Sequence, residues 1–185
     1  ESDEPTPRLK GQVHLTLLHT SDIHSRLFPY NLQLGQVDAG LGLGEALTIA
    51  NVGGVARISH IVGRERARAS RVLHLDGGDC FQGAPIFNFF SGEAEIRSLA
   101  AMGVDAMIVA NHEFDRGWRE LLRLQHGGCE QFTVRTPCQI SRPFEGARFG
   151  FLAANTVRED GQTLLPPTGL KRFHEGGATV TVGFI

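Results

Sequence analysis

The chain has 185 residues, of which 41% are hydrophobic and 21% are charged, and its formal net charge is −2 at pH 7. A chain of this length can bury a core of its own, and this composition is that of an ordinary globular protein. The balance of charge excludes the strongly basic surface expected of a protein that binds a nucleic acid polymer. No apolar run reaches the roughly 18 residues that a transmembrane helix needs.

The first residues and the cysteines bear on the cellular compartment. Residues 1–12 are predicted to be a disordered leader, because their first part is acidic, polar and contains proline. Such a segment could remain after a secretory signal is removed. Cys129 and Cys138 could form a disulfide in an oxidising compartment, and two free thiols are equally compatible with their spacing. Cys80 is interpreted as a small packed residue.

Apolar runs and helical periodicity alternate along the chain. The first predicted strand, residues 13–18, is expected to be buried, and so are the strands that follow it. The predicted strands are 13–18, 72–75, 105–109, 149–153 and 179–184. The predicted helices are 54–69, 93–101 and 117–125. This order predicts a layered α/β fold built from βαβ units.

Some side chains are expected to pack inside this fold. Val55, Ile58, Ile61 and Val62 recur at helical spacing and are expected to face the core. The last helix is expected to bury Trp118, Leu121 and Leu122. The histidines His14, His19 and His74 lie in or beside strands and are expected to be packed. Residues 29–47 are expected to be an excursion that is partly loop, and residues 129–146 to be polar and irregular. The final strand has only just begun at Ile185, which predicts a fragment of a longer protein.

Three of the predicted strands are followed by clusters of potential metal ligands. Asp22 and His24 follow the first strand, Asp79 follows the strand 72–75, and Asn111 follows the strand 105–109. Ligands of α/β proteins bind at the carboxyl ends of the strands, where these clusters would meet. Each motif alone is more often an ordinary turn; an isolated Asp79, for example, would be interpreted as a turn-capping residue. Together they predict a site for more than one metal ion.

The third cluster also contains a possible acid–base pair. His112 directly follows Asn111, and Asp115 lies three residues further on. That spacing allows the Asp115 carboxylate to accept a hydrogen bond from the imidazole and to fix its tautomer.

In this order, the clusters and the residues around them resemble the metallophosphoesterase domain of the 5′-nucleotidase / UDP-sugar hydrolase family, which is part of the calcineurin-like phosphoesterase superfamily. The matching segments are Leu17-Leu18-His19-Thr20-Ser21-Asp22-Ile23-His24, Asn51-Val52-Gly53-Gly54, Leu75-Asp76-Gly77-Gly78-Asp79 and Asn111-His112-Glu113-Phe114-Asp115. The resemblance covers about residues 13–185 and implies a layered metallophosphoesterase sandwich with metals at the carboxyl ends of its strands.

The resemblance also implies roles for the site residues. Asp22 and His24 would hold a first metal ion, Asp79 would bridge two ions, and Asn111 would hold the second. His112 and Asp115 would form the catalytic dyad. The cofactors would be two divalent cations such as Mn, Zn or Fe, the substrate a small phosphate ester such as a nucleotide, and the location periplasmic or extracellular.

The chain departs from the family pattern in two respects. The family completes its site with later histidines, including a Gly-His-x-His motif, and has a separate nucleoside-binding domain; neither occurs here. Residues 13–185 are therefore expected to be the N-terminal part of a metallophosphoesterase domain, inactive by itself. Two alternatives stay open. The long stretch 31–50 is similar to one in thiosulfohydrolases, which would act on sulfur esters, and a catalytically incomplete chain could serve as a binding module.

Overall fold

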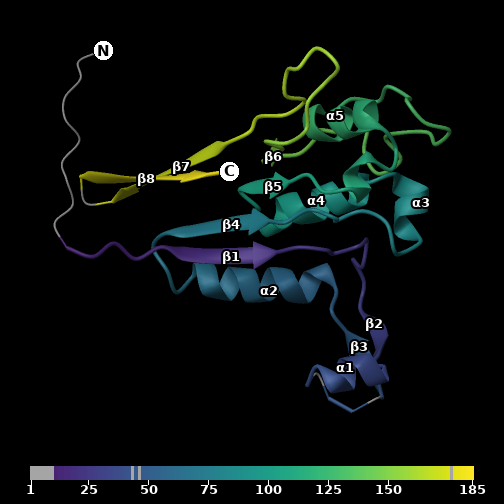
Figure 1. The fold of residues 1–185 in the computed structure, drawn as a ribbon, viewed down its shortest axis with the longest axis horizontal. Coiled ribbons are helices and arrows are strands. Elements are labelled where there is room, and N and C mark those ends of the chain that lie inside the picture. The colour runs from purple at the N-terminus through teal and green to yellow at the C-terminus, as the bar shows by residue number, and fades with distance from the viewer. Residues whose placement is uncertain (1–10, 43, 46, 176) are drawn as a thin grey trace.

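A parallel sheet of four strands organises the molecule. The computed structural model describes residues 11–42, 44–45, 47–175 and 177–185, so residues 1–10 of the predicted leader lie outside it. The strand order is β1-β4-β5-β6, and every neighbouring pair is parallel (Figure 1). These strands are β1 (Thr16–Thr20), β4 (Val72–Asp76), β5 (Ala106–Ile108) and β6 (Gly150–Leu152). Because they are parallel, their carboxyl ends form one edge of the sheet.

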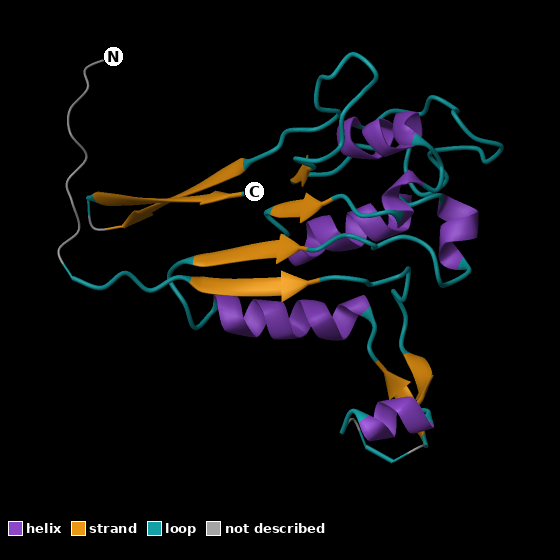
Figure 2. Ribbon diagram, in the orientation of Figure 1, coloured by secondary structure: helices purple, strands orange, loops and turns teal. Residues whose placement is uncertain are grey.

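Helices connect the strands, as parallel pairing requires. The longer ones are α2 (Val55–Arg66), α4 (Glu93–Met102) and α5 (Trp118–His126), and α2 contacts α4 (Figure 2). The short elements α3 (Ile86–Phe90) and η1 (His112–Phe114), a turn of 3₁₀ helix, follow β4 and β5 respectively. The βαβ organisation expected from the sequence is confirmed.

Two antiparallel hairpins complete the described elements. The first pairs β2 (Tyr30–Gln33) with β3 (Thr48–Val52) and has α1 (Gln36–Gly40) between its strands. It projects away from the sheet beyond α2 (Figure 1). The second pairs β7 (Gly169–Glu175) with β8 (Ala178–Phe184). Its Lys171 side chain forms an ion pair of 2.7 Å with Asp105, which also accepts a hydrogen bond from the amide of His74.

The hydrophobic core gathers side chains from the sheet, from α4 and α5, and from the loop that follows β4. Its members are almost inaccessible to solvent and close-packed, which is the main source of stability in a domain of this size. The largest apolar side chains that are fully buried are Phe81, Phe87, Ile96, Leu99, Met107, Leu121, Leu124 and Phe151. Cys80 is also fully buried, as expected of a packed residue.

The structure corrects several predictions about local structure. The helix predicted over 54–69 begins at Val55, with Gly54 as its N-cap after β3 ends at Val52, and it ends at Arg66. The stretch 29–47, expected to be an excursion that is partly loop, contains β2 and α1. Strand β7 was not predicted: its apolar side chains Leu170 and Phe173 are separated by two charged residues, and only three of its seven positions are even partly buried.

Several predictions that a side chain would be buried were wrong. Trp118 is 49% exposed and Ile61 50% exposed, since the helices that carry them turn only one side to the core. Leu17 is 62% exposed because it lies, with His19, on the exposed face of β1, whose residues alternate between partly buried and exposed. His14 and His19 are also exposed, whereas His74 is fully buried and hydrogen-bonded to Thr20 as predicted.

Membrane insertion finds no support in the described segments: none of their helices combines the length and the apolar character of a membrane span.

Candidate metal centre

The loops that follow β1 and β4 run side by side beyond the ends of their strands. The amide of Asp22 donates to the carbonyl of Gly78 at 2.9 Å, and the amide of His24 donates to that of Asp79 at 3.1 Å. The parallel pairing of the two strands is thus continued by the two loops. Their polar side chains are held at one edge of the sheet by backbone hydrogen bonds, which do not depend on a bound ion.

The backbone of these loops is unusual at the residues that matter. Asp22, His24 and Asp79 have φ angles of 53°, 47° and 51°, in the left-handed region that residues other than glycine seldom adopt. Such conformations cluster at functional sites, where the surrounding structure maintains them. Gly78 explains the close approach to β5: a Cβ atom there would lie 2.4 Å from the carbonyl oxygen of Ile108.

Three predicted ligands converge. Asp22, His24 and Asp79 each offer one ligand atom, and these atoms all lie within 4.8 Å of one another. The Nε2 atom of His24 is 3.7 Å from a carboxylate oxygen of Asp22. Two carboxylates and an imidazole form a donor set that suits Mn, Fe or Zn, so the residues present fit a divalent transition metal.

The predicted dyad lies beside these ligands. The Nδ1 atom of His112 is 2.9 Å from a carboxylate oxygen of Asp115, and the backbone amide of His112 donates to Asp79 at 3.0 Å. The His112 and His24 rings meet edge to face with centroids 5.3 Å apart. The hydrogen bond that His112 donates to Asp115 raises the pKa of His112, and the charges of Asp115 and Asp79 act in the same direction.

Asn111 is placed less directly. It is exposed and precedes His112, whose amide contacts Asp79, so its side chain starts from the loop that borders the converging ligands. The structure therefore brings Asp22, His24, Asp79 and the pair His112–Asp115 together, and it brings Asn111 to the same loop.

Sequence reasoning assigned no role to Glu113, which proves central to the geometry. This side chain is 2% exposed, and its carboxylate accepts three backbone hydrogen bonds of 2.9 Å. The donors are the amides of Asp79, Cys80 and Ala110. One buried carboxylate thus ties the loop after β4 to the loop after β5. The sequence did contain a signal for Glu113. It is the one charged residue between His112 and Phe114 in a motif whose other polar residues were assigned to metal binding or to the dyad.

Burial affects a second acidic residue of the loop. Asp76, at the end of β4, is 1% exposed, and burial raises the pKa of its carboxyl group, whereas hydrogen bonds from Thr20 and Gly78 oppose that rise. Asp76 therefore supports the loop that leads to Asp79 rather than facing the ligands.

The chain is similar to several known proteins. No family model matches the chain. It is 30% identical over 176 residues to an uncharacterised protein encoded in the pqq-V 5′ region of Acinetobacter calcoaceticus, covering 94% of this chain and 85% of that protein. It is 39% identical over 112 residues to the snake venom 5′-nucleotidase of Gloydius brevicauda, covering 60% of this chain and 18% of the venom protein.

Solved structures agree with these relatives. The 5′-nucleotidase precursor of Thermus thermophilus superposes with a TM-score of 0.62 at 32% identity, covering 90% of this chain and 27% of that one. A sulfate thiohydrolase of Thermus thermophilus gives a TM-score of 0.59 at 21% identity, covering 95% of this chain and 36% of the other; this likeness shows the fold alone. The chain spans about a fifth to a quarter of the length of the nucleotidases that it matches.

The chain has the α/β fold of calcineurin-like phosphoesterases, with a parallel sheet whose carboxyl edge carries the candidate ligands. Within that fold, the chain is similar to 5′-nucleotidases over a part of their length. The alternative of a sulfur-ester hydrolase is not favoured, because the matches at 30% identity or more that carry a named activity are nucleotidases.

Proposed function

We propose that the chain forms the metal-binding part of a hydrolase that cleaves the phosphate ester bond of nucleotides. The observation that carries the proposal is the convergence of Asp22, His24 and Asp79 beside the pair His112–Asp115. The nucleotidase relatives support the choice of substrate class.

Each residue takes a specific part in this proposal. Asp22 and His24 would hold one divalent cation, Asp79 would serve as a ligand for both cations, and Asn111 would be a ligand for the second. When bound, such a pair of cations supplies an activated water and neutralises the charge of the phosphoryl oxygens. The Glu113 carboxylate keeps the amides of Asp79 and Ala110 in place, so that the loops carrying Asp79 and Asn111 stay in register.

The proposed role of His112 follows from its hydrogen bond to Asp115. The Asp115 carboxylate accepts a hydrogen bond from Nδ1–H of His112 and so fixes Nδ1 as a protonated nitrogen. The other ring nitrogen, Nε2, is then available for proton transfer. The raised pKa keeps a larger share of His112 protonated near neutral pH. As water adds to phosphorus and the ester P–O bond breaks, Nε2–H of the imidazolium gives its proton to the departing oxygen. Hydrolysis then yields an alcohol and inorganic phosphate.

The proposal extends to the domain and its location. Residues 13–185 would be the N-terminal part of a metallophosphoesterase domain, completed by histidines from a further segment. A disulfide joins Cys129 to Cys138, with Cα atoms 5.6 Å apart. Disulfides persist in oxidising compartments, which supports a periplasmic or extracellular location.

Replacing Asp79 tests the metal centre. In the full-length protein supplied with Mn²⁺, Asp79→Ala is expected to abolish release of phosphate from adenosine 5′-monophosphate and to lower the bound metal measured by elemental analysis. Asp38→Ala is the matched control, since Asp38 is a carboxylate of the remote helix α1. Unchanged activity in Asp79→Ala would refute the assignment.

Replacing Asp115 tests the dyad separately from the metals. Asp115→Asn is expected to lower kcat by about 100-fold, within the range of general acid catalysis, and to leave the metal content unchanged. A parallel loss of metal would show that Asp115 acts on the ions and not through His112.

A further inference from the structure

Three polar side chains next to the metal loops form a network of hydrogen bonds, which we call the buried network. They are His74 and Asp76 of β4 and Thr20 of β1. Side chains two positions apart on a strand share a face, and Thr20 lies opposite Asp76 in the parallel register, so the three meet on one face of the sheet. His74 and Asp76 are 0% and 1% exposed. The proposed function gives Thr20 and His74 no task.

The hydrogen bonds of the buried network have a defined direction. The Thr20 hydroxyl donates its only proton to a carboxylate oxygen of Asp76 at 2.5 Å. The hydroxyl oxygen therefore accepts from His74, whose Nε2 atom is 3.1 Å away. Nε2 is thus the protonated ring nitrogen. Nδ1, which is buried and has no hydrogen-bond partner among the described residues, is the unprotonated one.

The surroundings of His74 favour its neutral form. Burial lowers the pKa of His74, and the positive charge of Arg66 on α2 and the neighbouring His19 of β1 lower it further. Asp105 acts in the opposite direction, but its carboxylate is engaged by Lys171 and by the backbone amide of His74. The neutral ring has a single N–H, the one on Nε2.

The buried network ends on the backbone that presents the proposed metal ligands. The second carboxylate oxygen of Asp76 accepts from the amide of Gly78 at 3.0 Å. The carbonyl of Gly78 accepts from the amide of Asp22 at 2.9 Å. Gly78 and Asp79 have successive φ angles of 84° and 51°, a conformation that the surrounding structure must maintain. An Asp side chain bonded to the backbone two residues further on is an Asx turn, which gives this support.

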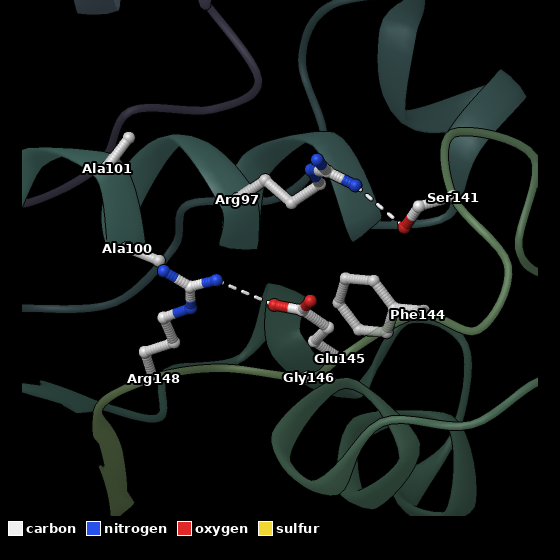
Figure 3. Close-up of a pocket in the computed structure, with 8 residues that line it drawn as sticks. All are labelled: Arg97, Ala100, Ala101, Ser141, Phe144, Glu145, Gly146 and Arg148. Carbon is white, nitrogen blue, oxygen red and sulfur yellow. Dashed lines mark hydrogen bonds and ion pairs between the residues drawn. The ribbon is translucent and has the colours of Figure 1, made fainter.

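A polar cluster elsewhere in the fold shows the contrast. In the cavity of Figure 3, Arg148 pairs with Glu145 at 2.7 Å, and Arg97 donates to Ser141 at 2.7 Å. The three charged groups are exposed to solvent, where such contacts contribute little. The buried network is enclosed instead, so the loss of one member leaves the others without a partner.

We infer that Thr20 and His74 are positioning residues of the metal centre, and that neither touches a cation. His74 orients the Thr20 hydroxyl, which in turn orients the Asp76 carboxylate. Asp76 holds Gly78, which lies where the loops carrying the proposed ligands meet. The inference rests on the proposed function, because it takes these loops to bind divalent cations.

The Mn²⁺ affinity of the full-length protein tests Thr20. Thr20→Val keeps the shape of the side chain and removes its hydroxyl. It is expected to raise the Kd for Mn²⁺ about tenfold, the lower end of the loss seen when a residue supporting a metal ligand is changed. Thr20→Ser keeps the hydroxyl and should stay within about threefold of the wild-type Kd. Calorimetric titration with Mn²⁺ measures both. Equal weakening by the two variants would assign the effect to packing and overturn the inference.

Two amide variants test the direction of the bond from His74. A glutamine amide can reach the place of Nε2, whereas an asparagine amide reaches that of Nδ1. His74→Gln should therefore retain the wild-type affinity for Mn²⁺, and His74→Asn should weaken it as much as Thr20→Val does. The opposite order would overturn the inference.

A core variant controls for a general loss of stability. Leu99→Val changes a side chain of α4 that is 1% exposed and lies outside the buried network. It should lower the midpoint of urea unfolding and leave the Kd for Mn²⁺ unchanged. A weakened affinity in this variant would mean that metal binding follows stability alone, which contradicts a positioning role.

Measurements without metal separate the inference from the proposed function. In the metal-free full-length protein, Thr20→Val is expected to speed hydrogen exchange of the Gly78 amide about tenfold, which is the loss of one hydrogen bond. Exchange of the Cys80 amide, which donates to Glu113, should not change. Nitrogen NMR of labelled histidine should show the Nε2–H tautomer of His74, and the Nδ1–H tautomer would overturn the inference.

The two failures then differ. If the wild type binds no Mn²⁺ but the exchange result holds, the proposed function is rejected, whereas the support of the turn by Thr20 is retained. If the wild type binds Mn²⁺ and Thr20→Val binds it equally well, the metal centre stands and the positioning role is rejected.

Discussion

Two buried regions near the metal centre satisfy their carboxylates in opposite ways. Around Glu113, three backbone amides donate to one carboxylate. At the start of α4, Glu93 pairs with Arg123 at 2.9 Å, whereas neither carboxylate oxygen of the neighbouring Glu95 has a hydrogen-bond partner among the described residues. All these acidic side chains are 1–2% exposed. Burial alone therefore says little about what a charged residue does.

The hydrogen-bonding and ionic partners of these buried carboxylates, and not the extent of their burial, determine their different roles. A carboxylate that accepts several amide hydrogen bonds holds the backbone in place. One that pairs with a buried arginine stabilises packing between helices, at a considerable cost of desolvation. One without partners shifts its pKa instead: burial raises the pKa of Glu95, and the nearby Ser25 opposes that rise only in part.

Arg123→Met is expected to have the largest effect. Arg123 forms ion pairs with Glu93 and Glu120, both also buried, and donates to the carbonyl of Gly128. Removing it leaves two buried carboxylates without a counter-charge, so the free energy of unfolding should fall by about 4 kcal/mol. Urea unfolding measures this. Arg119→Met, on the exposed side of the same helix, should change it by less than about 0.5 kcal/mol.

Glu113→Gln is expected to come next and to affect both stability and metal binding. An amide has a single acceptor oxygen, and its NH₂ group would face backbone amides that are themselves donors. We expect a loss of about 3 kcal/mol in the free energy of unfolding, and a fall in metal content because the loop carrying Asp79 loses its support. Elemental analysis and urea unfolding provide the two readouts. An exposed control is Glu130→Gln; equal effects of the two would remove Glu113 from the site.

Glu95→Gln should stabilise the protein, and the gain should depend on pH. Because burial raises the pKa of Glu95 above its ordinary value of 4.5, the unfolded chain loses this proton at a lower pH than the folded one. Wild-type stability therefore falls as the pH rises from 4.5 through the folded pKa. Glutamine never ionises, so the variant should equal the wild type below pH 4.5 and exceed it near pH 7. A pH-independent difference between the two would contradict this account.

The smallest effect is expected for Ser25→Ala. The Ser25 hydroxyl is buried and has no hydrogen bond of ordinary geometry among the described residues, so its removal should change the free energy of unfolding by no more than about 0.5 kcal/mol. Because Ser25 opposes the rise in the pKa of Glu95, that pKa should move further upward. Carboxyl NMR titration of Glu95 measures the change. A large destabilisation would mean that the hydroxyl is well satisfied after all.

Much of the fold could be predicted because apolar periodicity is a local signal. The strands β4, β5 and β6 and the helices α2, α4 and α5 follow runs and spacings that can be seen in the chain itself. The hairpin β2–β3 and the strand β7 could not be found in this way, because their half-exposed residues lack a strong pattern. Trp118 was assigned to the core because an aromatic residue in a helix is usually packed. The position of the neighbouring elements decides which side of a helix is covered, and the sequence does not show that position.

The sequence by itself determined which residue types stand after which strands, and hence the family and the candidate ligands Asp22, His24, Asp79 and Asn111. That was possible because parallel strands bring their carboxyl ends to one edge. The tertiary structure alone decided the roles of Glu113 and Glu95 and the exposure of Trp118. Hydrogen bonds between loops, the absence of a partner and the exposure of a ring all depend on segments that are distant in the chain, and a one-dimensional pattern does not record those distances.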